Sequence, residues 1–199
     1  MGRTRGFEET AVLHSMRDRF WTYGYEGTST YDLMDVTGLG KGSIYHAFGG
    51  KHDLYLRIFA DYCTDLVADA RSALGNVQGG SPLARIEHYL TSLAEFFGTE
   101  SPRRGCFLSR ATGDLAGIDE AVAAQSRRTF AELAGLLAAT VTAAQEAGEV
   151  AAEVDAVDLG WLLLSVIRGI DTIARAGVDA DVLHRAARTA LVLIPRTSA

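Results

Sequence analysis

The sequence has few of the residues that mark disulfide-rich, zinc-binding or membrane-spanning proteins. Its 199 residues include two cysteines and three prolines, too few cysteines for a disulfide framework or a four-ligand zinc site. The longest apolar run, residues 161–167, is broken by Ser165 and is far shorter than the ~20 residues that cross a bilayer. The first residues lack the apolar segment of a secretory signal. We therefore expect a cytoplasmic protein without a membrane span.

Lysine is almost absent as well. Lys41 and Lys51 are the only lysines among 19 basic residues, and they bracket one ten-residue segment. Residues 1–57 carry seven basic and seven acidic side chains, so the whole net charge of −6 lies in residues 58–199. The two parts of the chain therefore differ in charge, and the pair of lysines marks a segment in which a compact cation could be needed.

The pattern of apolar residues predicts an all-α protein. With 48% apolar residues the chain can bury a core, and these residues recur at intervals of three and four rather than two. Glycines fall mostly at the breaks between periodic segments. About nine helices are expected, over residues 7–23, 29–37, 41–47, 51–74, 82–98, 105–116, 118–147, 155–176 and 179–194.

Two of these expected helices are short and adjacent. Ser29 followed three residues later by Asp32 matches a capping box, with Asp in place of Glu, and Gly38 is placed to end the same helix in a left-handed conformation. After Gly38-Leu39-Gly40 a second short helix begins at Lys41. Helices of this length need support from neighbours, and two joined by a glycine turn are typical of a helix-turn-helix motif.

The motif residues resemble a known family. About residues 8–55, and within them the pattern Lys-Gly-Ser-x-Tyr-x-x-Phe-x-x-Lys from Lys41 to Lys51, are similar to the N-terminal DNA-binding domain of TetR family transcriptional regulators. The resemblance implies a helix-turn-helix domain at residues 1–52 and a helical ligand-sensing and dimerisation domain at residues 53–199. The helix that begins at residue 51 would continue between them as a connector.

The resemblance and the chemistry of the side chains give a set of candidate DNA contacts. Gly42 would let the second short helix approach the groove, and hydroxyl and amine groups would reach bases or phosphates. Gly40 and Ala47 depart from the family pattern, in which a capping Ser or Thr and a histidine are frequent, so His46 is the nearby imidazole. The candidate contacts are Thr28, Ser29, Thr30, Lys41, Gly42, Ser43, Tyr45, His46 and Lys51.

The last two long helices carry broad apolar stripes. Each stripe is wider than a single contact within the chain requires. This width predicts a four-helix interface between two chains, and the alternative is burial within one chain. The expected interface residues are Leu159, Leu163, Val166, Ile170, Leu183, Ala190 and Leu191.

The resemblance also implies a pocket for a small molecule in the second domain. Arg110 and Arg168 need partners in such apolar helices, either an acid one turn away (Asp114 or Asp171) or an anionic ligand. Cys106 could have a lowered thiolate pKa beside Arg103 and Arg104 at a helix start, or it could be an inert buried thiol. The candidate pocket residues are Tyr62, Tyr89, Phe96, Phe97, Cys106, Phe107, Arg110, Trp161 and Arg168.

The resemblance, together with these patterns, implies a homodimeric repressor that binds a palindromic operator in double-stranded DNA and is released by a small-molecule effector. The alternatives are a regulator that senses electrophiles or oxidants through Cys106, and a DNA-binding protein without ligand control. The five histidines are scattered without catalytic or metal-ligand spacing, so we expect no enzymatic activity, no metal site and no cofactor.

Overall fold

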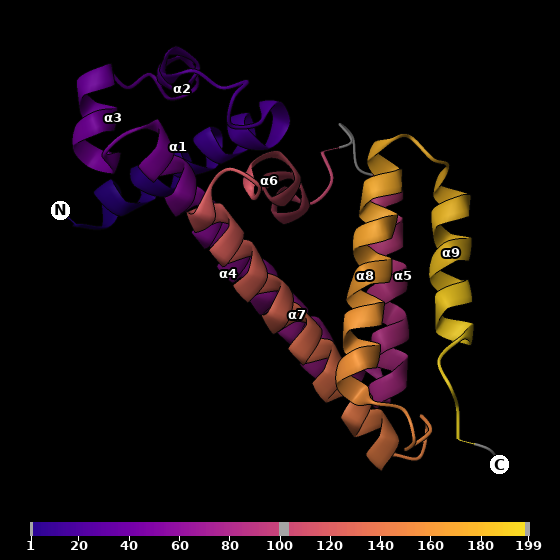
Figure 1. The fold of residues 1–199 in the computed structure, drawn as a ribbon. Helices are drawn as coiled ribbons and strands as arrows, with labels where there is room; N and C mark the ends of the chain where they lie inside the picture. The colour runs from indigo at the N-terminus through magenta and orange to yellow at the C-terminus, as the bar shows by residue number, and fades with distance from the viewer. Residues whose placement is uncertain (1, 100–103, 198–199) are drawn as a thin grey trace.

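The structure, a computed structural model, describes residues 2–99 and 104–197 (Figure 1). Over these ranges the chain forms nine α-helices and a 3₁₀ helix at Val77–Gly79, and the only β-type pairing is one bridge between Val150 and Arg196. The prediction of an all-α protein is confirmed. The helices are α1 (Gly2–Tyr23), α2 (Thr30–Thr37), α3 (Lys41–Phe48), α4 (Lys51–Gly75), α5 (Pro82–Thr99), α6 (Phe107–Leu115), α7 (Glu120–Glu146), α8 (Ala156–Arg175) and α9 (Ala180–Val192).

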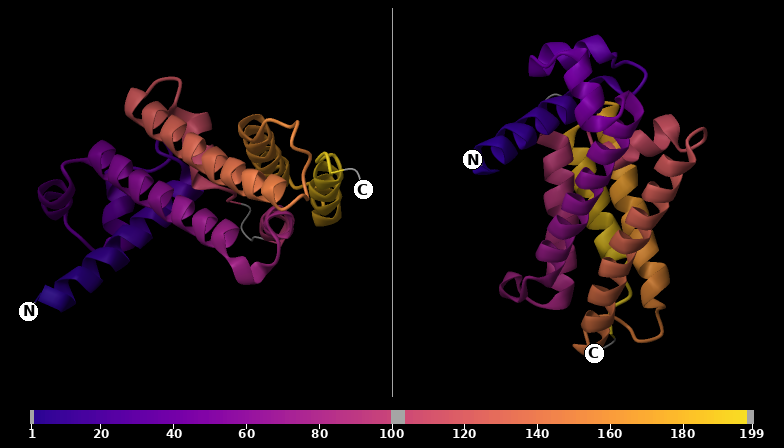
Figure 2. Two further views of the ribbon diagram at one scale, coloured as in Figure 1. Left: turned by 90° about the horizontal axis from the view of Figure 1, so that it is seen from below. Right: turned by 90° about the vertical axis from the view of Figure 1, so that its left-hand side faces the viewer.

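The helices form a small head and a longer body. Helices α1, α2 and α3 cluster at one end of the molecule, and α4 leads away from them, packed along α7 (Figures 1 and 2). Helices α5, α8 and α9 complete the body, and the short α6 lies between head and body. Helix α4 runs without a break past residue 52, where the sequence places the domain boundary, so the two parts share one continuous connector.

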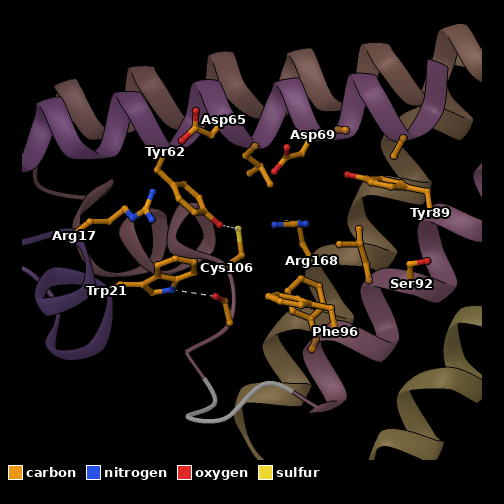
Figure 3. A pocket seen from close by; sticks show the side chains of 16 residues that line it. Arg17, Trp21, Tyr62, Asp65, Asp69, Tyr89, Ser92, Phe96, Cys106 and Arg168 are labelled. Carbon is orange, nitrogen blue, oxygen red and sulfur yellow. Dashed lines mark hydrogen bonds between the residues drawn. The ribbon is translucent and has the colours of Figure 1, made fainter. Parts of the chain in front are cut away.

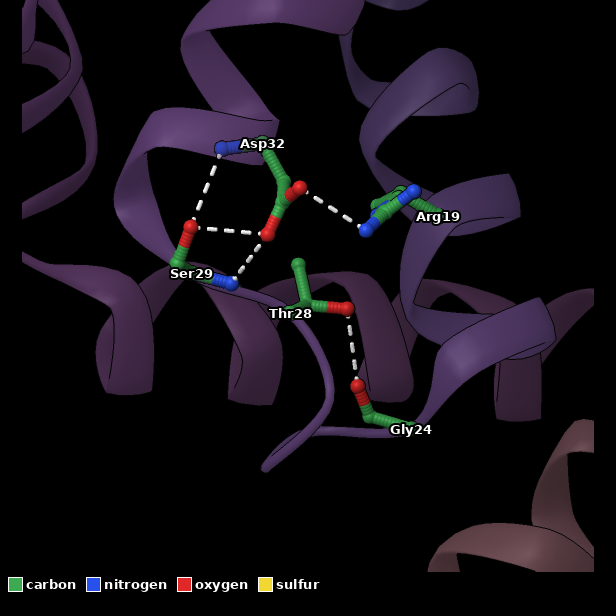
Figure 4. Close-up of polar contacts among 5 residues, drawn as sticks. All are labelled: Arg19, Gly24, Thr28, Ser29 and Asp32. Atoms are coloured by element: carbon green, nitrogen blue, oxygen red, sulfur yellow. Dashed lines mark hydrogen bonds and ion pairs between the residues drawn. The ribbon is translucent and has the colours of Figure 1, made fainter.

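Local sequence signals fix the helix-turn-helix. Ser29 Oγ accepts a hydrogen bond from the Asp32 backbone N–H at 3.2 Å, and Asp32 Oδ2 accepts one from the Ser29 backbone N–H at 2.7 Å (Figure 4). Arg19 of α1 pairs with the other Asp32 carboxylate oxygen at 2.8 Å, which ties α2 to α1. Gly38 ends α2 with φ +69°, in the left-handed region that glycine adopts without strain. The capping box and the glycine cap are confirmed.

One aromatic cluster joins the head to the body. Phe20 of α1 packs edge-on against Tyr55 of α4 with ring centroids 5.1 Å apart, and Tyr55 in turn packs against Phe107 of α6 at 5.8 Å. All three side chains are almost fully buried. Displacing any one of these rings would leave a cavity or a clash, so the helix-turn-helix and α6 are held together by packing as well as by the connector.

Within the two described ranges, no helix is both long enough and apolar enough to cross a membrane.

Candidate DNA interface and ligand pocket

Helix α3 is anchored by Ile44 and by the partly buried Phe48, and its other residues are exposed. Ile44 is fully buried against the rest of the head. The residues around it leave a polar surface on the outside of the molecule. The exposed α3 residues include the predicted contacts Lys41, Gly42, Ser43, Tyr45 and His46.

The glycine at position 42 is not required by the fold. A Cβ added there would meet no atom within 4 Å, and α3 begins at Gly40 without a side-chain cap. The first turn of α3 is therefore narrow and unobstructed. Such a surface can approach the floor of a DNA groove closely.

The three hydroxyl residues before α2 have different environments. Thr28 is fully buried, and its Oγ1 donates to the Gly24 carbonyl oxygen at 2.8 Å (Figure 4). The prediction that Thr28 contacts DNA is therefore wrong, because its hydroxyl closes the turn after α1. Ser29 is exposed but engaged in the capping box, and Thr30 is half-buried.

Lys51 has a partner within the head. Its Nζ donates to the Tyr25 carbonyl oxygen at 3.0 Å and lies 4.0 Å from the centre of the Tyr25 ring. A cation at a helix N-terminus opposes the helix dipole, and the Tyr25 contacts offset that cost without a phosphate. The ammonium group keeps two further N–H bonds for a DNA phosphate, and that contact stays a prediction.

Tyr31 is an exposed residue that the sequence reasoning missed. It is 75% exposed at the start of α2. Together with Ser29, Thr30, Met34 and Lys41 it lines a shallow hollow of about 240 Å³ between α2 and α3. The signal available in the sequence was an aromatic residue two positions after Ser29, the N-cap of α2. The structure places Tyr31 beside the predicted DNA contacts.

A cavity of about 540 Å³ lies between α1, α4, α5, α8 and the residues that precede α6 (Figure 3). This volume is typical of small-molecule sites. Of the predicted pocket residues, the structure brings together six: Tyr62, Tyr89, Phe96, Phe97, Cys106 and Arg168. The sequence reasoning missed the contribution of α1, which supplies Arg17 and Trp21, and that of the acidic residues Asp65 and Asp69 on α4.

Three predicted pocket residues do not line this cavity, which corrects the prediction. Phe107 is fully buried in the aromatic core. Trp161 is 43% exposed on the outer surface of α8. Arg110 pairs with Asp114 at 3.3 Å and donates to the Thr22 carbonyl oxygen at 3.2 Å. Sequence periodicity identified these side chains as apolar or embedded but could not give the rotation of each helix.

Arg168 points into the cavity and is poorly satisfied. Beside an electrostatic interaction with Cys106, it makes a long hydrogen bond, 3.5 Å, to Ser109 Oγ, and its Nε is covered and has no partner. Asp171, the acid predicted to pair with it, is fully buried, and its Oδ1 instead accepts the Cys106 backbone N–H at 2.9 Å. Burial opposes the charge on Arg168, but Cys106, Asp171 and Tyr89 outweigh it and raise the pKa of the guanidinium above its usual value.

The two cysteines occupy different environments. Cys106 Sγ lies 3.4 Å from Tyr62 Oη on the cavity wall, and Cys106 is only 3% exposed. Cys63 is buried on the inner side of α4, and this burial raises the pKa of its thiol to about 11. Arg103, predicted to act on Cys106, lies outside the described residues, whereas Arg104 pairs with Asp18 of α1 at 3.1 Å. Among the described residues, no group of three His, Cys, Asp or Glu side chains is placed to hold a metal ion.

The cavity wall is hydrogen-bonded directly to the head. Trp21 Nε1–H donates to the Gly105 carbonyl oxygen at 3.0 Å, and Arg104 lies over the Trp21 ring at 4.7 Å. The residues that line the cavity therefore include two side chains of α1, Arg17 and Trp21, and the backbone segment that holds Cys106. A molecule in the cavity would touch both parts of the protein.

The predicted dimer residues are mostly buried within their own chain. Leu159, Leu163, Ile170, Leu183 and Leu191 are at most 6% exposed, while Val166 and Ala190 are half-buried. The five buried residues cannot form an interface, because they pack in the intramolecular core, which was the alternative. Other apolar residues of the same two helices remain exposed, namely Val157, Trp161, Leu162, Ile173, Val182 and Val192.

Comparisons with known proteins agree with this geometry. Residues 13–58 match the model described as bacterial regulatory proteins, tetR family, and residues 82–190 match the tetracyclin repressor-like C-terminal domain. The HTH-type transcriptional repressor ComR of Escherichia coli is 28% identical over 201 residues, covering 98% of this chain and 92% of that protein.

Solved structures show the same fold. The regulator CifR, a cysteine mutant in complex with 26-bp double-strand operator DNA, aligns with TM-score 0.81 and 25% identity over 92% of this chain and 95% of its own. A TetR regulator of Chloroflexus aurantiacus aligns with TM-score 0.86 and 24% identity over 98% of this chain and 100% of its own. With family models covering both its head and most of its body, the chain belongs to the TetR family and is a DNA-binding transcriptional repressor, not an enzyme.

Proposed function

We propose that the protein is a cytoplasmic homodimer that represses transcription by binding a palindromic operator, and that a small molecule in the cavity releases it. Residues 1–52 would bind DNA, and residues 53–199 would sense the effector and dimerise. The observation that carries this proposal is the exposed polar face of α3, which Ile44 and Phe48 anchor to the core, in a molecule whose cavity is lined partly by α1.

The exposed residues of α3 support reading of DNA in the major groove. Ser43 and His46 can exchange hydrogen bonds with base edges, while Lys41 and the Tyr45 hydroxyl suit phosphates. A single helix of eight residues reads only a few base pairs, and two related by symmetry read an inverted repeat. The 26-bp operator in the CifR complex is long enough for two half-sites about one helical turn apart.

The outer surface of α8 and α9 supports dimerisation. These helices lie side by side at the edge of the body (Figure 1). Leu162 and Val157 are each 58% exposed and Trp161 is 43% exposed on α8, and Val182 adds to the surface from α9. Contiguous exposed apolar side chains mark interaction surfaces, and pairing two copies here would make a four-helix interface.

Two structural links support transmission from cavity to DNA. Helix α4 carries Tyr62 in the cavity and Lys51 at the head. The Trp21–Gly105 hydrogen bond is a second link, independent of α4. A ligand that tilts α4 or displaces Trp21 would change the separation of the two α3 helices, and a coupling free energy of about 1–3 kcal/mol is enough for a clear switch.

The proposal is tested by selecting double-stranded DNA from a random pool with the purified protein. We expect an inverted repeat to be enriched by the wild type and not by Ile44→Asp, which removes the fully buried anchor of α3. The control variant is Val77→Asp, a charge placed on a side chain that is 78% exposed in the 3₁₀ helix after α4, outside both the head and the α8–α9 surface. A folded wild-type protein that enriches no sequence at low salt would contradict the DNA-reading assignment.

Covalent sensing through Cys106 is a second candidate, favoured by the position of its Sγ on the cavity wall 3.4 Å from the Tyr62 hydroxyl. In this case the Cys106 thiolate would add to an electrophile such as N-ethylmaleimide, forming a C–S bond while the maleimide carbon takes up a proton. One adduct should appear by mass spectrometry in the wild type and none in Cys106→Ser. Operator binding that survives complete modification would exclude this mode of control.

A DNA-binding protein without ligand control would have a solidly packed body. The cavity of about 540 Å³ instead supports a sensor, because native cores contain few voids larger than a water molecule.

A further inference from the structure

We infer that the effector is an acid with an apolar, flat body, whose carboxylate is bound by Arg168 between the aromatic walls of the cavity. This inference rests on the proposed function, because it names the chemical class of the molecule that the same cavity would bind. It starts from the unsatisfied guanidinium group and from the character of the groups around it (Figure 3).

The Arg168 side chain lacks a full set of hydrogen-bond acceptors. Its guanidinium has five N–H bonds, yet beside the electrostatic interaction with Cys106 the protein supplies one long hydrogen bond, 3.5 Å, to Ser109 Oγ, and Nε is covered without a partner. No carboxylate in the described part of the chain forms an ion pair with it. A partly buried cation with a covered, unpaired N–H is costly unless an anion compensates it.

The nearest buried acid does not fill that role. Asp171 sits one turn along α8, but its Oδ1 is committed to the Cys106 backbone N–H at 2.9 Å. Its other oxygen, Oδ2, is buried and has no hydrogen-bond partner, so neither Asp171 Oδ2 nor Arg168 Nε satisfies the other. Asp171 therefore lowers the cost of the Arg168 charge at a distance and leaves the guanidinium N–H groups for a ligand.

The polar groups beside Arg168 are donors. Tyr89 and Tyr62 both line the cavity, and burial raises the pKa of each hydroxyl, so both remain protonated. The Tyr62 hydroxyl accepts the Phe107 backbone N–H at 3.3 Å and lies 3.4 Å from Cys106 Sγ, so its proton can go to that sulfur or to a ligand. In Figure 3 the Tyr89 hydroxyl and the Arg168 guanidinium both point toward the middle of the cavity. A group of donors around a fixed cation matches a carboxylate.

The acidic lining residues are exposed, and one of them, Asp69, points toward the same part of the cavity as Tyr89 and helps to raise the pKa of the Tyr89 hydroxyl (Figure 3). Asp65 and Asp69 are exposed on α4, where water screens their charges. A cationic ligand would have to place its charge at these solvated acids and its apolar body against Arg168, which is unfavourable for both groups. The reverse orientation places an anion inside, and the rings of Trp21 and Phe96 then contact the apolar body.

The test compares ligands of one shape and three charges. Trp161 lies outside the cavity, so the Trp161→Phe protein keeps Trp21 as its only tryptophan, and quenching of Trp21 by nitrobenzenes then measures occupancy of the cavity. The probes are 4-nitrobenzoate, 4-nitrobenzamide and 4-nitrobenzylammonium at pH 7. We expect the anion to bind at least about tenfold more tightly than the amide, and the ammonium to bind most weakly.

Variants of two arginines on α8 complete the test. Arg168→Gln should remove the preference for the acid over the amide, Arg168→Lys should keep part of it, and Arg175→Gln, an exposed arginine outside the cavity lining, should leave it unchanged. Should Arg168→Gln fail to fold, the ratio of the affinities for 4-nitrobenzoate and 4-nitrobenzamide, measured in the parent protein and in Arg168→Lys, still tests whether Arg168 binds the carboxylate. Displacement of 4-nitrobenzoate by decanoate or by 2-naphthoate distinguishes fatty acids from aromatic acids as the source of the carboxylate.

Equal or tighter binding of the amide or the ammonium would overturn the inference, as would an Arg168→Gln protein that still prefers the acid. Binding of the selected DNA is measured on the same preparations. A protein that binds its operator but shows no preference for the acid disproves only the inference about the effector. A protein that enriches no DNA disproves the proposed function, whatever the cavity binds.

Discussion

Trp21 Nε1–H, on the last turn of α1, donates a 3.0 Å hydrogen bond to the carbonyl oxygen of Gly105, 84 residues later in the chain. The Trp21 ring lines the cavity, and Gly105 precedes Cys106 on the cavity wall. This hydrogen bond thus joins the last turn of α1 to a backbone segment that lines the cavity. Helix α4 is the second connection between the same two regions.

Removing this hydrogen bond should destabilise the protein. Trp21→Phe keeps an aromatic ring but leaves the Gly105 carbonyl without its indole donor, so we expect the free energy of unfolding to fall by about 1–2 kcal/mol. Tyr31→Phe, on a residue of α2 that is 75% exposed and outside the α8–α9 surface, should change it by less than ~0.5 kcal/mol. Urea denaturation checks both, and an equal effect of the two variants would mean that the Trp21–Gly105 bond contributes nothing.

Gly105 should tolerate no side chain. Its φ is +65°, and an added Cβ would lie 2.5 Å from both Asp171 Oδ1 and Arg175 Cδ. Gly105→Ala should therefore lower the free energy of unfolding by more than ~2 kcal/mol. Gly113 of α6 has nothing within 4 Å of an added Cβ, so Gly113→Ala should stabilise by about 0.5–1 kcal/mol. Thermal unfolding of the two variants should shift in opposite directions, and a shared direction would refute this explanation.

Asp119 should make stability depend on pH. His52 Nε2 lies 2.7 Å from Asp119 Oδ2, and this hydrogen bond, aided by the α7 backbone N–H groups, lowers the pKa of the carboxyl. The stability that Asp119 contributes is therefore present above its unfolded pKa of about 3.9 and is lost as pH falls through the lower folded value. Asp119→Asn retains a capping oxygen. We expect the wild-type advantage over Asp119→Asn to shrink between pH 5 and pH 3 in denaturation series, and a constant difference would contradict the pKa shift.

Lys41 should account for one phosphate contact. It is exposed at the first turn of α3, and Lys41→Ala should weaken operator binding on all sequences and reduce the slope of log K against log salt by about 0.9. Lys51→Ala should also weaken binding, with a smaller change in slope and a loss of stability, because Lys51 Nζ holds the Tyr25 carbonyl. Fluorescence anisotropy at several salt concentrations measures the slopes, and an unchanged slope for Lys41→Ala would remove it from the interface.

Ser43 and Tyr45 should affect specificity differently. Both are exposed on α3, but a hydroxyl at a base edge selects sequence whereas one at a phosphate does not. We expect Ser43→Ala to change the ranking of operator variants by about 1–3 kcal/mol at one position and Tyr45→Phe to weaken all variants equally. Binding to a set of single-base operator variants tests this, and a uniform loss for Ser43→Ala would move Ser43 to the phosphates.

The ends of the helices could be predicted because capping residues close in sequence determine them. Ser29, Asp32 and Gly38 act within one turn of the chain, so their effects need no knowledge of the tertiary structure. The pocket was partly predictable, since aromatic residues and Arg168 stand out in apolar helices. The contribution of Trp21 was not, because residues 21 and 105 are distant in sequence and nothing local links them.

The dimer residues show where sequence reasoning fails. Helix α8 has apolar residues on more than one side, and periodicity does not tell which side faces α7 and which faces outward. Leu163 and Ile170 pack inside, while Leu162 and Ile173 stay exposed. Lys51 is a similar case, because its long side chain folds back onto Tyr25 and only the three-dimensional structure places that carbonyl within reach.

The central claim, that two α3 helices at a fixed separation read one operator, is tested most directly by changing the spacing of the half-sites. The inverted repeat enriched from random DNA is compared with the same sequence carrying a central insertion of ~5 bp, about half a helical turn. We expect the insertion to weaken binding by about 100-fold or more, because the added half turn rotates one half-site to the other side of the duplex. Equal affinity for the two DNA molecules would contradict the central claim.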